Sequence, residues 1–111
     1  MRYAEFRGAS AVDAHFERAD LRGAVFTPSK VGRTNLKQAQ FNGADLRGAV
    51  FDGADLSGAD FREARLEGTS FKGANLSAVN FDLADLKGAI YDAGTIWPVG
   101  FYAPPDRGVI E

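Results

Sequence analysis

The sequence predicts an all-β fold, a narrow solenoid whose short coils stack along one axis. Two observations predict this fold. The residues repeat with a period of five along almost the whole chain, and the large apolar residues at the centres of the repeats alternate between Leu and Phe. Glycine follows many of the centres at a fixed distance, which supplies the corner that a coil requires.

The five-residue unit is plainest in the middle of the chain, where Ala-Asp-Leu-Arg-Gly at 44–48 is followed by Ala-Val-Phe-Asp-Gly at 49–53. Neither an α-helix, with a period of 3.6, nor a flat strand, with a period of two, keeps such a pattern in register. The small residue and the central Leu or Phe are two apart, so an extended segment points both inward and the polar residue between them outward. The remaining two residues form the corner, which glycine occupies at Gly43, Gly48, Gly53, Gly58, Gly68, Gly73 and Gly88.

The alternation of Leu and Phe predicts how many units make one coil. From Leu36 to Leu86 the centres alternate strictly, so four units per coil place like residues above one another. Three units per coil would set Phe over Leu in successive turns, and we therefore predict a square cross-section with between four and five coils. The four predicted columns are Phe41, Phe61 and Phe81; Leu46, Leu66 and Leu86; Phe51, Phe71 and Tyr91; and Leu36, Leu56, Leu76 and Ile96.

These units match the A(D/N)LXX signature, and the chain therefore resembles the pentapeptide-repeat family over most of its length. The resemblance implies a right-handed quadrilateral β-helix, a handedness that the periodicity does not supply. The segment from Tyr91 to Phe101 also resembles the C-terminal ending of many bacterial members, especially cyanobacterial ones.

The repeat phase predicts two parts, a β-solenoid at residues 1–98 and an irregular C-terminal tail at 99–111. An exposed coil end leaves apolar core and unpaired strand groups, so we expect the tail to cap it through Trp97, Phe101 and Tyr102. Residues 27–33 keep the five-residue phase but do not have the residue types of the repeat. The sequence is compatible there with either a bulged loop or a regular coil.

Composition and residue types argue against several classes of function. Basic and acidic residues nearly balance at a net charge of -2, so we expect no direct nucleic-acid binding, and no apolar stretch is long enough for a membrane span. His15 is the sole histidine and cysteine is absent, so we expect no metal site and no cofactor. The N-terminus does not read as a secretory signal, which favours a cytoplasmic protein.

No group of residues forms a catalytic constellation, and we expect a protein that is not an enzyme. The repeated aspartates Asp20, Asp45, Asp55, Asp60 and Asp85 occupy the position where the repeat asks for Asp or Asn, and we assign them to solvation or to the corner amides. One face carries apolar outward residues, Val12, Val50 and Ile90, and is the candidate interaction face.

Two functional hypotheses follow. The first is a rigid scaffold for protein–protein interaction, whose partner is an unknown protein or a second copy of the chain. The alternative is a DNA-mimic regulator, similar to the quinolone-resistance pentapeptide proteins that act on DNA gyrase. The resemblance implies a longer and more acidic rod for that role than this sequence provides.

Overall fold

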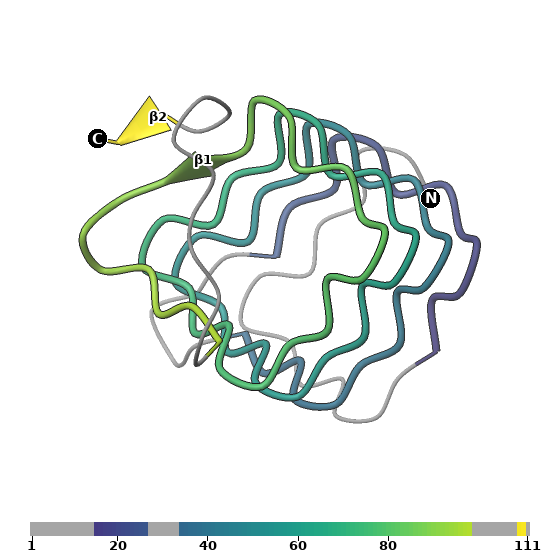
Figure 1. The fold of residues 1–111 in the computed structure, drawn as a ribbon, viewed down its shortest axis with the longest axis horizontal. Helices are drawn as coiled ribbons and strands as arrows, with labels where there is room; N and C mark the ends of the chain where they lie inside the picture. The colour runs from purple at the N-terminus through teal and green to yellow at the C-terminus, as the bar shows by residue number, and fades with distance from the viewer. Residues whose placement is uncertain (1–14, 27–33, 99–108, 111) are drawn as a thin grey trace.

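The backbone winds into squared coils that stack side by side along one axis (Figure 1). The structure is a computed structural model and describes residues 15–26, 34–98 and 109–110. In Figure 1 the coils follow one another from the purple N-terminal part to the green and yellow C-terminal part, and backbone bridges join each described coil to the next. This arrangement is the predicted solenoid.

Each five-residue unit supplies one side of a coil and one corner. In the unit centred on Phe41, the Ala44 N–H donates to the Phe41 carbonyl at 3.0 Å, and Gly43 between them has a φ of 71°. A positive φ at the third residue of such a four-residue turn is the signature of a type II turn. The chain therefore turns sharply after every central residue.

Adjacent coils are joined by parallel backbone pairing at the outward residue of each unit. The bridges Gln40↔Asp60 and Asp60↔Asn80 connect three successive coils at intervals of twenty residues. Around them the Phe41 N–H donates to the Asp60 carbonyl at 2.7 Å, and the Asp60 N–H donates to the Ala39 carbonyl at 2.9 Å. Because one residue per side pairs in this way, continuous strands are short, namely β1 (Ile90–Tyr91) and β2 (Val109–Ile110), which pair in parallel.

The core consists of stacked side chains, as the alternation of Leu and Phe predicted. Phe61 stacks on Phe41 with ring centroids 4.9 Å apart and planes 3° apart, and Phe51 stacks on Phe71 at 5.5 Å. Rings of the two opposite columns also meet edge to face, as Phe51 and Phe61 do at 5.8 Å. Four units per coil are therefore confirmed between Leu36 and Tyr91, and the centres in this span are almost completely buried.

The first described coil is longer than the sequence predicts. His15 pairs with Gln40, Asp20 with Asp45, and Val25 with Val50, each twenty-five residues apart, whereas Asn35 pairs with Asp55 at the usual twenty. Phe16 consequently stacks on Phe41 at 5.1 Å, and Phe26 stacks on Phe51 at 4.6 Å. The stretch between Phe26 and Thr34 thus contains one complete unit more than a coil uses, and its residues 27–33 lie outside the described residues.

In the last coil, the predicted position of Ile96 is wrong. Ile96 pairs with Asn75, twenty-one residues away, so the repeat phase ends before it and one additional residue is present in the turn. The Thr95 hydroxyl donates to the Phe71 carbonyl at 2.8 Å and holds Thr95 inward, which turns Ile96 outward to 53% exposure. Trp97 therefore follows Leu36, Leu56 and Leu76 in the fourth column in place of Ile96.

Candidate interaction face

The repeated aspartates bind corner amides, as expected from their place in the unit. Asp60 Oδ1 accepts the Arg62 N–H at 2.9 Å, and Asp85 Oδ1 accepts the Lys87 N–H at 3.0 Å. Asn80 does the same for the Asp82 N–H at 2.9 Å, which explains why Asp and Asn interchange at this position. The prediction is confirmed for all five aspartates, Asp20, Asp45, Asp55, Asp60 and Asp85.

Three of these carboxylates also form ion pairs across the corner, Asp20 with Arg22, Asp45 with Arg47, and Asp60 with Arg62. Arg62 donates from Nε and a terminal nitrogen to Asp60, the latter at 2.7 Å, and Arg47 binds Asp45 in the same way. The hydrogen bonds from Arg62 lower the pKa of Asp60, and those from Arg47 lower the pKa of Asp45. Both aspartates are thereby held ionised as structural acceptors, the opposite of what a general acid needs.

One side of the solenoid differs from the other three in its outward residues. The bridges Val25↔Val50, Val50↔Ser70 and Ser70↔Ile90 place these four residues in one ladder, and β1 continues it by pairing Ile90 with Val109. We call this side the Val/Ile face. The corresponding ladder on the opposite side contains His15, Gln40, Asp60 and Asn80, which are all polar.

Glycine borders the Val/Ile face at both of its corners. Gly23, Gly48, Gly68 and Gly88 form one corner column, and Gly53 and Gly73 lie in the other, all with positive φ. The residues other than glycine that adopt positive φ are confined, among the described residues, to the two remaining corners: Arg18, Gln38, Glu63, Ala78 and Leu83. Side chains therefore project beside the polar face, and none projects from these glycines beside the Val/Ile face.

The turns at one edge of the Val/Ile face are closed by the neighbouring coil. Val50 and Ser70 replace the usual Asp or Asn, so Asp52 accepts both the Ser70 hydroxyl and, at 3.1 Å, the Lys72 N–H of the next coil. Asp92 likewise accepts the Gly73 N–H at 3.0 Å. The apolar ladder thus remains compatible with satisfied corner amides, and sequence reasoning, which included neither Val25 nor Ser70 in this face, did not anticipate the arrangement.

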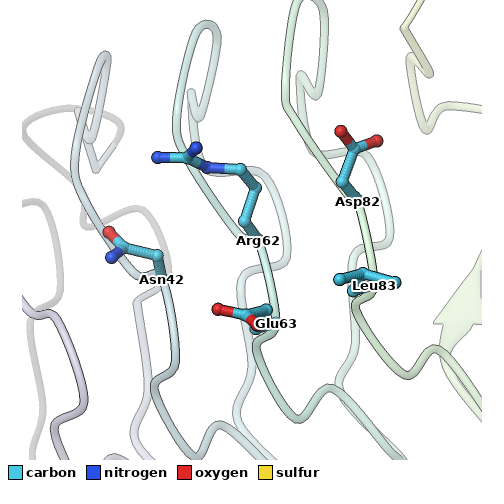
Figure 2. A pocket seen from close by; sticks show the side chains of 5 residues that line it. All are labelled: Asn42, Arg62, Glu63, Asp82 and Leu83. Atoms are coloured by element: carbon cyan, nitrogen blue, oxygen red, sulfur yellow. The ribbon is translucent and has the colours of Figure 1, made fainter.

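A shallow depression lies across three coils at a corner of the polar face (Figure 2). Its lining residues are Asn42, Arg62, Glu63, Asp82 and Leu83, and Figure 2 shows them on successive coils. The Arg62 guanidinium is already engaged by Asp60, and Leu83 is 84% exposed. Its charges are mixed and the hollow is open, so the geometry does not define a ligand.

The family model for pentapeptide repeats matches residues 1–27, 32–68 and 54–90, with eight copies of the repeat. The chain belongs to the pentapeptide repeat family. No curated protein shows significant sequence similarity to it.

Solved structures of other pentapeptide repeat proteins share this fold. The protein alr5209 from Nostoc PCC 7120 is 29% identical, with a TM-score of 0.62 over 96% of this chain and 84% of its own. Rfr23 from the cyanobacterium Cyanothece 51142 is 20% identical, with a TM-score of 0.55 over 86% of this chain and 89% of its own. These similarities and the family match confirm the expected right-handed quadrilateral β-helix.

The remaining predicted site residues divide between described and undescribed parts of this pentapeptide repeat chain. Val50 and Ile90 lie on the Val/Ile face, whereas Val12, Phe101 and Tyr102 lie outside the described residues. Trp97 is half-buried against the last coil, with its ring centroid 6.2 Å from Phe81 and 5.4 Å from Tyr91. The division at residue 98 and the capping role of the tail stay predictions.

His15 lies at the surface and binds Glu17 through Nδ1 at 2.9 Å. Within the described ranges, no three His, Cys, Asp or Glu residues are grouped as a metal site would need. The same part of the chain contains no helix of the length and apolar character that crossing a membrane requires.

Proposed function

We propose that this pentapeptide repeat protein is a rigid, non-enzymatic scaffold that presents its Val/Ile face to another protein or to a second copy of itself. The observation that carries the proposal is the pairing of an outward ladder that is apolar except for Ser70 with glycine at both bordering corners. Proteins of this family are generally structural or interaction scaffolds, which supports the same assignment.

The glycine columns support a contact surface because internal packing does not explain them fully. A Cβ added to Gly48 or Gly68 would meet no atom within 4 Å, so the protein's own side chains leave room at these positions. Their positive φ favours glycine, yet five other corners tolerate side chains at the same angle. Glycine here has the further effect of letting a partner's surface approach the backbone closely.

Rigidity supports a scaffold role as well. Each described coil is fixed to the next by regular backbone hydrogen bonds, and stacked aromatic rings run through the centre of these coils. A preformed surface of this kind loses little conformational entropy when a partner binds. A cytoplasmic location forms part of the same proposal.

Affinity capture from native cell extract, followed by mass spectrometry, tests the proposal with a matched pair of variants. Val50→Lys places a charge on the Val/Ile face, and Gln40→Lys places the same charge at the equivalent outward position of the polar face of the same coil. We expect the wild type and Gln40→Lys to retain the same partner and Val50→Lys to lose it. Equal retention by both variants would show that the Val/Ile face is not the contact surface.

A further inference from the structure

Every described coil presents the same two-residue row on the Val/Ile face. A corner glycine is followed two residues later by the outward residue of the ladder, in the pairs Gly23 and Val25, Gly48 and Val50, Gly68 and Ser70, and Gly88 and Ile90. Each glycine lies at the corner with positive φ, and the outward residue lies on the side of the coil that follows this corner, so the two columns run next to each other along the solenoid. The face therefore has a ridge of side chains beside a parallel trough of glycines.

We propose that this face binds the same face of a second copy of the chain, with the two solenoids side by side. The two-fold axis that relates the copies runs parallel to the solenoid axes and lies between the two facing surfaces. This inference rests on the proposed function and names its partner. Such an axis places the ridge of each copy over the trough of the other and keeps every row level with its equivalent. An axis across the solenoids would instead set ridge on ridge.

The charges that border the face match this arrangement row by row. Beside the trough lie Arg47, Glu67 and Lys87, and beside the ridge lie Asp52, Lys72 and Asp92. The two-fold axis brings the first column of one copy opposite the second column of the other. Each row then joins opposite charges, Asp52 with Arg47, Lys72 with Glu67, and Asp92 with Lys87, and symmetry makes each pairing twice.

The sign reversal in the third described coil is what makes the match specific. The first column is positive except at Glu67, and the second column is negative except at Lys72, which lies in the same coil. A shift of one copy by one coil would therefore place Asp52 opposite Glu67 and Lys72 opposite Lys87, which are pairs of like charge. The reversed orientation, centred on the Ser70 row, would set Asp52 against Asp92. Only the level, parallel arrangement satisfies all three rows.

We expect a weak and salt-sensitive dimer. Four rows spaced about 4.8 Å apart give a contact much smaller than the roughly 800 Å² per partner of a standard interface. The border charges are partly exposed, with the Arg47 side chain at 38% and Glu67 at 28%, so salt screens them. A dissociation constant in the micromolar range or above is the expected scale.

Sedimentation equilibrium over a wide concentration range tests the dimer with purified protein alone. We expect Val50→Lys to weaken association at least about tenfold and Gln40→Lys to leave it unchanged, a difference of roughly 1.4 kcal/mol or more. A lysine should fit the outward position because Arg65 occupies it on another side, and circular dichroism melts check the fold of each variant. A wild type that stays monomeric at millimolar concentration would overturn the inference.

A charge exchange tests the pairing itself. Lys72→Glu and Glu67→Lys each set like charges against each other in the third row, and we expect each to weaken the dimer about tenfold. The double variant restores opposite charges and should associate within about threefold of the wild type. Failure of the double variant to recover, with both single variants folded, would overturn the proposed row pairing.

Spin labels test the orientation, because the chain contains no cysteine of its own. Arg22→Cys and Lys87→Cys place a label in the same border column on the first and fourth described coils. In the parallel dimer both labels should give similar intermolecular distances, whereas the reversed orientation separates both pairs along the solenoid axis. If the protein is monomeric but Val50→Lys alone still loses a captured partner, the scaffold proposal stands and the dimer is wrong.

Discussion

The corners of the coils require a positive backbone φ, which glycine adopts easily and other residues adopt only with strain. Thirteen described residues have positive φ, eight of them glycine and five with side chains. A left-handed conformation costs residues other than glycine on the order of 1 kcal/mol or more, because Cβ approaches the neighbouring backbone. The protein tolerates that cost at Arg18, Gln38, Glu63, Ala78 and Leu83, and all five lie away from the Val/Ile face.

Gly48→Ala measures the cost of this angle alone. The new Cβ meets no atom within 4 Å, so we expect a loss of about 1–2 kcal/mol that comes from the φ of 73° and not from a clash. Ala78→Gly is the reverse change at an equivalent corner, and we expect it to stabilise the fold by a similar amount, because the strain that it relieves exceeds the added entropy of the unfolded chain. Urea denaturation checks both, and a neutral Gly48→Ala would contradict the strain argument.

The ion pair of Asp60 makes stability depend on pH. Hydrogen bonds from Arg62 lower the pKa of Asp60 in the folded state, so the unfolded chain takes up the proton at higher pH. The pair therefore stabilises the fold above the ordinary carboxyl pKa of about 3.9, and this contribution is lost as pH falls through the lower folded pKa.

Asp60→Asn isolates that contribution, because an amide keeps the corner cap, as Asn80 shows one coil later. We expect the variant to be less stable than the wild type at pH 7 and the difference to shrink as pH falls below the ordinary carboxyl range. Urea melts across a pH series provide the measurement. A difference that does not change with pH would assign the stability to something other than the ionised pair.

At the scale of the coil, stability comes from contacts between neighbours. Phe61 stacks on Phe41 and on Phe81 and meets Phe51 and Phe71 edge to face. We expect Phe61→Ala to cost about 3–5 kcal/mol, because it removes a fully buried ring and leaves a cavity among four others. Arg62→Ala, next in sequence but exposed, should cost at most about 1 kcal/mol. Similar urea melts for the two variants would contradict the inward and outward assignment.

The sequence predicts the regular coils well because the Leu and Phe centres alternate without exception from Leu36 to Leu86. Leu36 to Tyr91 follow a strict order, and only four units per coil keep like residues in contact. The longer first coil could not be found in this way, since a complete additional unit leaves the five-residue phase unchanged. The sequence therefore did not predict that Val25 pairs with Val50 in the same ladder. Ile96 was misplaced because Thr95 is also compatible with an inward position, and its hydroxyl bond to a carbonyl is visible only in three dimensions.

At the C-terminal end of the molecule, two contacts cover the last coil. β2 pairs with β1, and Trp97 packs against Phe81 and Tyr91. We expect truncation after Pro98 to remove the β2 pairing and to promote association through the uncovered end of the last coil. Sedimentation of the truncated protein measures this, with Val50→Lys added to suppress association through the Val/Ile face. An unchanged sedimenting species with an unchanged melting temperature would remove the capping role.

We also expect the protein not to inhibit DNA gyrase. Duplex DNA carries a negative charge about every 1.7 Å, whereas here Arg22, Arg47 and Arg62 pair with aspartates on the same coils. Such a surface lacks the dense negative field that a DNA mimic needs. A supercoiling assay with purified gyrase and increasing protein tests this expectation, and strong inhibition would favour the DNA-mimic hypothesis over the scaffold.

The twenty-five-residue spacing of the first described coil also bears on how such a chain can change during evolution. Gain of one complete repeat in the gene would ordinarily rotate every earlier residue by a quarter turn relative to the later ones and scramble the surfaces. Here Phe16 and Phe26 still stack on Phe41 and Phe51 across the longer interval. An interval of twenty-five residues in place of twenty therefore leaves the identity of each side of the solenoid unchanged before and after it.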